Sequence, residues 1–103
     1  MDPFKPIKSK PRLVTPPRLT IEMAEAVALQ AMAFIAADDE LLSQFLAASG
    51  CDVEALKRRV TERYFLAGVL DFVLADESTV VAFSRHIGFS PETPMLAREL
   101  LGR

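Results

Sequence analysis

Apolar residues follow one another almost without interruption from Glu22 to Ala37, in the segment EMAEAVALQAMAFIAA. Glu22, Glu25 and Gln30 are its only polar positions, and it contains neither glycine nor proline. Alanine, leucine, methionine and glutamate favour helices, so the segment is predicted to be a helix with Thr20 as its N-cap. Because apolar residues occupy nearly every face, we expect neighbouring elements to cover this helix on most sides.

Two shorter amphipathic helices are predicted to follow this segment. Asp38 or Asp39 is placed to cap the first, and Gly50 ends it, because glycine is favoured just past the end of a helix. Asp52 is predicted to cap the second, which we expect to continue to Arg63. The inward positions expected in the second helix are Val53, Leu56 and Val60.

A second core helix is predicted from Tyr64 to Ala75, where apolar residues dominate again. Gly68 lies in its middle and costs about 1 kcal/mol relative to alanine, so we expect another helix to approach closely there. Asp71 is the acidic residue of this segment and falls on its least apolar face. This position favours solvent exposure, or an ion pair with an arginine of the N-terminal segment, over a catalytic role.

Two more helices complete the pattern. Asp76 is predicted to cap the fifth, which Gly88 ends. The sixth has two possible starts, with Ser90 or Thr93 as cap and Pro91 or Pro94 at its first position, and Thr93 with Pro94 is favoured because Pro94 inside a longer helix would cost a backbone hydrogen bond. The positions expected to pack in the sixth helix are Met95, Leu96, Leu100 and Leu101.

A shift of 38 residues superimposes the two halves of this pattern. The pairs that it aligns include Phe34 with Phe72, Phe45 with Phe83, and Gly50 with Gly88. The fold class that follows is all-α, a compact bundle of five or six short helices. One interpretation is that two three-helix halves repeat with pseudo-twofold symmetry, which would place the first and fourth helices together at the centre. The other is that the two halves share only the signals that short capped helices have in common.

The segments Ala24 to Phe34, Phe45 to Gly50 and Phe65 to Glu77 resemble a family of small bacterial proteins catalogued as a domain of unknown function. The resemblance covers about residues 22–101 and leaves out the N-terminal segment. It implies an all-α bacterial protein and supplies no activity, ligand or site residue.

The first 19 residues differ in composition from the rest of the chain. They hold five of the seven prolines and carry Lys5, Lys8, Lys10, Arg12 and Arg18 against Asp2 alone. Residues 20–103 carry 7 basic and 13 acidic side chains. Because proline removes amide donors, residues 1–19 are predicted to be a disordered basic leader, and residues 20–103 a single helical domain.

The expected location is the cytoplasm. The single cysteine, Cys51, cannot form an internal disulfide, which favours a reducing compartment. No secretory signal is visible at the N-terminus. The longest near-continuous apolar run, Met23 to Ala37, is shorter than the roughly 20 residues that a membrane span needs, so no membrane partner is expected.

The sequence offers little for catalysis or metal binding. One cysteine and one histidine cannot build a structural zinc site, and the acidic run from Asp38 to Glu40 lacks the spacing of a calcium loop, so we expect no metal and no cofactor. Cys51 and His86 are the candidates for nucleophilic catalysis, but nothing places them together. We expect no enzyme, and the remaining enzyme hypothesis requires Asp71 and His86 to line one hollow.

The folded part contains one basic cluster, formed by Lys57, Arg58, Arg59 and Arg63. Arg59 and Arg63 are one helical turn apart and are expected to share a face. With the leader, the cluster is a candidate for contacts with phosphate or an acidic partner, although the plainer interpretation is a solvated helix face. The leading functional hypothesis is a non-enzymatic protein-interaction or self-associating helical module. Its grounds are that half of the residues of this short chain are hydrophobic and that the sequence contains no catalytic constellation. Weak nucleic-acid binding is the alternative.

Overall fold

The computed structural model describes residues 19–102. This part of the chain folds into six α-helices and contains no strand. The helices are α1 (Ile21–Ala36), α2 (Asp39–Ser49), α3 (Val53–Arg59), α4 (Arg63–Leu74), α5 (Glu77–Ile87) and α6 (Thr93–Leu101). The predicted all-α bundle is therefore confirmed. The predicted leader lies outside the described residues apart from Leu19, which is half-buried against the core.

The predicted N-caps set the starts of four helices. Thr20 Oγ1 accepts a hydrogen bond from Met23 N at 3.1 Å at the start of α1. Asp38, Asp52 and Asp76 accept in the same way from first-turn amides of α2, α3 and α5. A side-chain cap of this kind typically stabilises a helix by about 1 kcal/mol, which explains why these starts were readable from local sequence.

The ends of α2 and α5 follow the predicted glycines, whereas the end of α3 and the cap of α6 differ from the prediction. Gly50 and Gly88 end α2 and α5 with φ angles of 72° and 78°, a region that favours glycine because it has no Cβ. α3 ends at Arg59, four residues before the predicted end at Arg63. α6 has Glu92 rather than Thr93 at its capping position, which makes Pro94 its second residue. Proline is tolerated there, because the first amides of a helix have no intrahelical partner.

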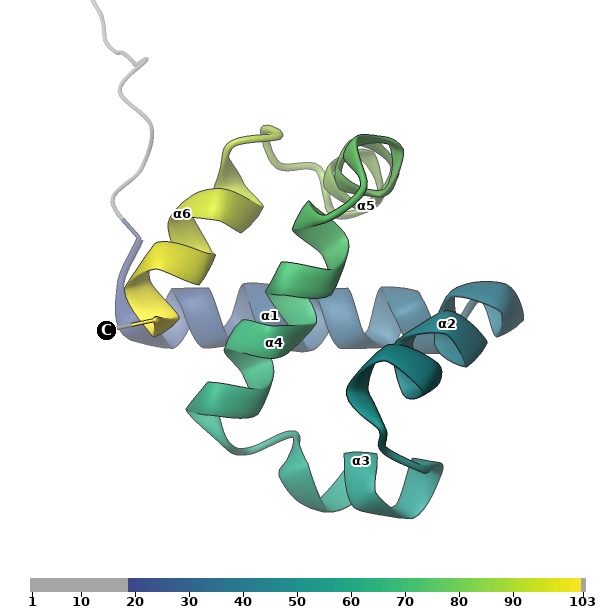
Figure 1. Cartoon of the computed structure of the whole chain (residues 1–103). Helices are drawn as coiled ribbons and strands as arrows, with labels where there is room; N and C mark the ends of the chain where they lie inside the picture. Colours follow the sequence, from purple (N-terminus) through teal and green to yellow (C-terminus); the bar gives the residue numbers. More distant parts are fainter. Residues whose placement is uncertain (1–18, 103) are drawn as a thin grey trace, which may run out of the picture.

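α1 and α4 form the centre of the fold, as the symmetric arrangement predicts. They cross each other, α6 packs against both, α2 packs against α1, and α5 packs against α4 (Figure 1). The largest fully buried side chains are Phe83, Ile35, Leu70, Val69, Val73 and Pro94. Full burial of one such apolar side chain contributes about 1.5–3 kcal/mol, so the contacts between these helices hold the fold together.

α1 is buried along one face, and the prediction that it would be covered on most sides is wrong. Met23 and Leu29 are 42% and 46% exposed, because the helices that pack against α1 all approach its other face. Three more residues predicted to pack are also exposed: Val53, Met95 and Leu96. In α6 Leu101 is buried as predicted, and the other buried positions are Pro94 and Ala97. No helix of the described part is long and apolar enough to cross a membrane.

The 38-residue spacing recurs in the aromatic packing. Phe34 of the first half packs on Phe83 of the second, with ring centroids 5.5 Å apart. The equivalent pair, Phe72 and Phe45, packs with centroids 5.3 Å apart. The third helices of the two halves differ, since α6 packs on both α1 and α4 and buries three residues, whereas α3 buries none. The pseudo-twofold symmetry therefore stays a prediction.

Candidate functional site

The α4 groove is a hollow of about 550 Å³ bounded by α2 and α4, with single side chains from α3 and α6. Its lining residues are Phe45, Ala48, Ser49, Arg59, Tyr64, Phe65, Gly68, Asp71, Phe72, Ala75 and Arg98. The α4 members recur at intervals of three or four residues because such positions lie on one face of a helix. The hollow lies in the size range of protein binding sites.

Gly68 lines this groove with open space above it. A Cβ added to Gly68 would have no atom of the described chain, beyond its own helix backbone and immediate neighbours, within 4 Å. The prediction that another helix approaches closely at Gly68 is therefore wrong. A glycine in a helix interior costs about 1 kcal/mol relative to alanine, and no contact within residues 19–102 uses the space that its missing side chain leaves.

Aromatic rings supply much of the groove surface. Phe45 meets Phe65 and Phe72 edge-on, with centroids 5.9 Å and 5.3 Å apart, a favourable geometry for aromatic pairs. Tyr64 lies one helical turn before Gly68 and is 84% exposed. Tyrosine combines a rigid apolar ring with a polar hydroxyl group and is enriched at protein interfaces. An exposed tyrosine beside an open hollow is therefore a candidate contact residue.

Asp71 joins α4 to α6 at the groove. Arg98 Nε donates a hydrogen bond to Asp71 Oδ1 at 2.6 Å, and the Asp71 side chain is 57% exposed. The exposure predicted for Asp71 is confirmed, and its ion-pair partner among residues 19–102 is Arg98, whereas the arginines of the leader lie outside the described residues. The hydrogen bond to Asp71 raises the pKa of Arg98, because it favours the charged guanidinium.

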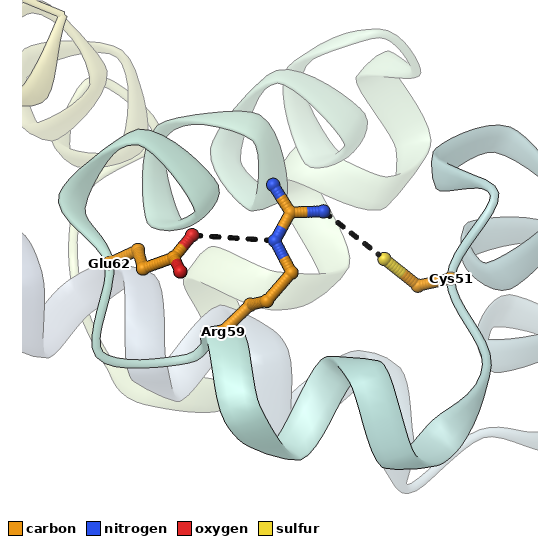
Figure 2. A network of polar contacts seen from close by, with 3 residues as sticks. All are labelled: Cys51, Arg59 and Glu62. Carbon is orange, nitrogen blue, oxygen red and sulfur yellow. Dashed lines mark hydrogen bonds and ion pairs between the residues drawn. The ribbon is translucent and has the colours of Figure 1, made fainter.

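Arg59 is held in the groove wall by three neighbours. Its Nε donates to Glu62 Oε1 at 3.3 Å, and one Nη atom lies 3.5 Å from Cys51 Sγ, as Figure 2 shows. Its guanidinium carbon lies 5.0 Å from the ring centroid of Phe65, within cation–π range. The hydrogen bond to Glu62 raises the pKa of Arg59 most, and the hydrogen bond to Cys51 raises it further. Arg59 therefore acts here as a structural part of the groove.

Arg59 and Arg63 do not share a helix face, contrary to the prediction. Arg59 ends α3 and Arg63 begins α4, with a turn between them. Arg63 Nε instead pairs with Glu25 Oε2 of α1 at 3.2 Å. The predicted cluster is therefore divided between two helices that point their cations at different partners.

The other two cations of the predicted cluster lie on α3. Lys57 Nζ is 4.0 Å from Glu54 Oε2, with both side chains largely exposed. Arg58 is exposed, and no ion pair joins it to another residue between positions 19 and 102. Since three of the four cations have carboxylate partners, the geometry does not favour phosphate contacts through this cluster, and nucleic-acid binding stays a prediction.

The candidate catalytic residues are dispersed over the fold. Cys51 is half-buried, while His86 lies in the last turn of α5, with its ring centroid 5.5 Å from that of Phe34. Asp71 lines the α4 groove and His86 does not, so the condition for the enzyme hypothesis is not met there. Between residues 19 and 102, no three His, Cys, Asp or Glu side chains are grouped to hold a metal ion, and Asp38 serves as a helix cap.

The sequence did not reveal the α4 groove as a site. The available signal was an aromatic residue and a glycine one turn apart, Tyr64 and Gly68, on the least apolar face of a core helix. The groove walls come from Phe45 and Arg98, which are distant in sequence and are brought there by tertiary packing.

Comparison with known proteins gives a family without an assigned activity. Residues 21–103 match the model of a family described as a protein of unknown function (DUF3572). The chain belongs to this family. The match confirms the resemblance to a family of unknown function and covers all six helices, so the α4 groove lies within the family domain. No curated protein and no solved structure is found to match the chain.

Proposed function

We propose that this protein is a non-enzymatic helical module that self-associates, with α4 of one copy seated in the α4 groove of a second copy. The observation that carries the proposal is the open space over Gly68, in a groove flanked by the exposed ring of Tyr64. A position without a Cβ lets another backbone approach closely. A docked helix would therefore use the feature that costs the isolated chain about 1 kcal/mol.

The α4 groove carries both features that a symmetric dimer through a single patch would use. A twofold interface brings together the same patch from both copies, so one patch must supply both a projection and a hollow. Tyr64 is the projection, and the space over Gly68, one turn later, is the hollow. Two α4 helices that cross at Gly68 would bring each Tyr64 towards the hollow of the partner. The burial of aromatic surface there supplies the driving force.

The charges around the groove favour such a partner over a nucleic acid. Arg59 and Arg98 are paired with carboxylates of the same chain. A polyanion binds through cations that it neutralises, and these two are already neutralised. The formal net charge of the whole chain is −2, which opposes the association of two copies only weakly.

Light scattering coupled to size-exclusion chromatography, over a wide range of protein concentration, tests this proposal. The wild-type full chain is expected to have the mass of a dimer at high concentration and of a monomer after dilution. Gly68→Gln is expected to remain monomeric, because its side chain fills the hollow while the monomer has room for it. Ala47→Gln adds the same side chain at an exposed position of α2 outside the groove and is expected to dimerise like wild type.

Two results would contradict self-association through the α4 groove. One is a wild-type chain that stays monomeric at every concentration. The other is a Gly68→Gln variant that dimerises as well as the Ala47→Gln control. Far-UV circular dichroism of both variants establishes that each keeps the wild-type helix content, so that a loss of dimer cannot be attributed to unfolding.

The proposed setting is the bacterial cytoplasm. The single cysteine suits a reducing compartment, because it leaves no partner for an internal disulfide. The bacterial origin follows the resemblance drawn from the sequence and belongs to the same proposal.

A further inference from the structure

A second hollow, of about 480 Å³, lies where the turn from α1 to α2 meets the turn from α4 to α5, and we call it the junction groove. Its large apolar side chains are Phe34, Leu41 and Phe72, and its acidic side chains are Asp38, Glu40 and Asp76. Phe72 and Ala75 also line the α4 groove, so the two hollows are neighbours.

The junction groove is built from equivalent positions of the two halves of the chain. Ten of its eleven lining residues form five pairs that are 38 residues apart. The pairs are Phe34–Phe72, Asp38–Asp76, Glu40–Ser78, Leu41–Thr79 and Gln44–Ala82. Equivalent residues meet around a twofold axis, so this lining supports a duplicated fold with its axis through the groove. Such a groove is a feature of the fold rather than an accident of one loop.

The junction groove combines negative charge with an apolar floor. Its lining residues, all within the described part of the chain, include three carboxylates and no lysine or arginine. Asp38 and Asp76 each cap a helix through one carboxylate oxygen, Oδ1 and Oδ2 respectively. Hydrogen bonds from the side chains of Thr79 and Ser78 lower the pKa of Asp76, so this carboxylate is ionised at neutral pH. The complementary occupant is a segment that is both basic and apolar.

We propose that the junction groove docks the N-terminal segment of the same chain, residues 1–18. This segment carries five basic residues and one acidic residue, whereas residues 19–102 carry six basic and thirteen acidic residues. The attraction is therefore between a segment of charge +4 and a body of charge −7. Phe4 and Ile7 supply apolar side chains for the floor of the groove. This docking uses a different hollow from the proposed dimer, with Phe72 and Ala75 common to both linings, and does not depend on self-association.

The N-terminal segment is long enough to reach the junction groove. The groove lies at the C-terminal end of α1, and the 16 residues of α1 rise about 24 Å at about 1.5 Å per residue. Extended chain covers about 3.3–3.6 Å per residue. Arg12 lies seven residues before Leu19 and therefore reaches about 24 Å from it, and Lys8 lies eleven residues before Leu19 and reaches about 38 Å. The basic stretch from Lys8 to Arg12 thus spans the distance from Leu19 to the carboxylates of the groove.

Paramagnetic relaxation enhancement in the full-length chain tests the docking. Cys51→Ser removes the native thiol, Ser9→Cys introduces a new one, and a nitroxide is attached at position 9. At low salt the amide signals of Gln44 and Ala82, which line the groove from α2 and α5, are expected to lose several-fold more intensity than that of Ala55 on α3. The loss is expected to disappear at about 1 M salt, where charges are screened beyond about 3 Å.

Charge reversal separates the groove from general attraction to an acidic protein. Glu40→Lys removes a groove carboxylate that caps no helix, and it is expected to abolish the signal loss at Gln44 and Ala82. Glu54→Lys makes the same change of charge on α3, outside the groove, and is expected to retain the loss. Two results would overturn the docking. One is an equal loss of signal intensity at Gln44 and Ala82 in the Glu40→Lys and Glu54→Lys variants. The other is the absence of a selective loss in the nitroxide-labelled chain that keeps both glutamates.

Mixing distinguishes the leader of the same chain from that of a second copy. A sample of isotope-labelled chain without nitroxide, mixed with unlabelled chain carrying it, is expected to show no selective loss at Gln44 and Ala82. Selective loss in the mixture as large as that within one chain would assign the groove to another copy and refute the proposal. The Gly68→Gln background, in which the proposed dimer is absent, keeps this result independent of self-association.

Discussion

Ser84 is the residue for which this fold makes its sharpest prediction about stability. Its side chain is 2% exposed in α5, and its Oγ has no hydrogen-bond partner within the described part of the chain. A buried hydroxyl group that has lost its water without gaining a partner costs about 1–3 kcal/mol. Ser84→Ala removes that group, and alanine is also the better helix former by up to about 0.7 kcal/mol. The removal of one oxygen atom from the core sacrifices only a few weak contacts.

We therefore expect Ser84→Ala to raise the free energy of unfolding by about 1–2 kcal/mol. For a domain of this size, each 1 kcal/mol raises the melting temperature by about 4–8 °C. Urea unfolding followed by far-UV circular dichroism measures the change, with an unchanged m-value as the sign that only stability has shifted. The matched control is Ser43→Ala on the exposed side of α2, which keeps the helix-propensity gain alone.

The comparison of the two alanine variants decides the question. If Ser84→Ala stabilises by no more than Ser43→Ala, Ser84 Oγ is not an unsatisfied group. If Ser84→Ala destabilises the protein, the hydroxyl group has a partner in solution, and the reasoning from its burial is refuted.

Two further predictions concern the helix ends. Gly88→Ala should destabilise the fold by about 1 kcal/mol, because a Cβ is unfavourable at a φ of 78°, and Gly88→Asn should lose less in the same urea measurement. The lowered pKa of Asp76 means that its ionised form stabilises the fold, a contribution that is present above about pH 4 and lost as the pH falls through the folded-state pKa. The stability gap between wild type and Asp76→Asn should therefore be larger at neutral pH than in acid, and a gap that is independent of pH would contradict the assignment.

The helix boundaries were predictable because their signals are local. Asp38, Asp52 and Asp76 bond to amides two or three residues away, and Gly50 adopts its left-handed conformation within the same turn. The packing was less predictable, because apolar composition does not record where neighbouring helices approach. Leu29 therefore lies exposed in a helix that was predicted to be covered on most sides.

The candidate sites could not be located from the sequence, because each depends on contacts between distant residues. Arg98 reaches Asp71 across 27 positions, and Arg63 reaches Glu25 across 38, so neither partner is visible from spacing within one helix. The prediction that Arg59 and Arg63 share a face failed for a local reason, since α3 ends at Arg59 and α4 begins at Arg63. The 38-residue spacing found in the sequence relates ten of the residues that line the junction groove, but the spacing alone did not indicate a hollow.

The central question left by the fold is why the middle of a core helix carries a glycine that no described part of the chain packs against. Gly68→Ala answers it, because its two effects have opposite signs. In the monomer, alanine at this open helical position should raise the free energy of unfolding by about 1 kcal/mol, measured by urea unfolding of dilute protein. In the proposed dimer, the same methyl group separates two helices that approach at Gly68, so the dissociation constant measured by sedimentation equilibrium should rise. A variant that is more stable as a monomer and still dimerises as tightly as wild type would remove Gly68 from the interface. A variant that is less stable as a monomer would show that the space over Gly68 is already occupied within the fold.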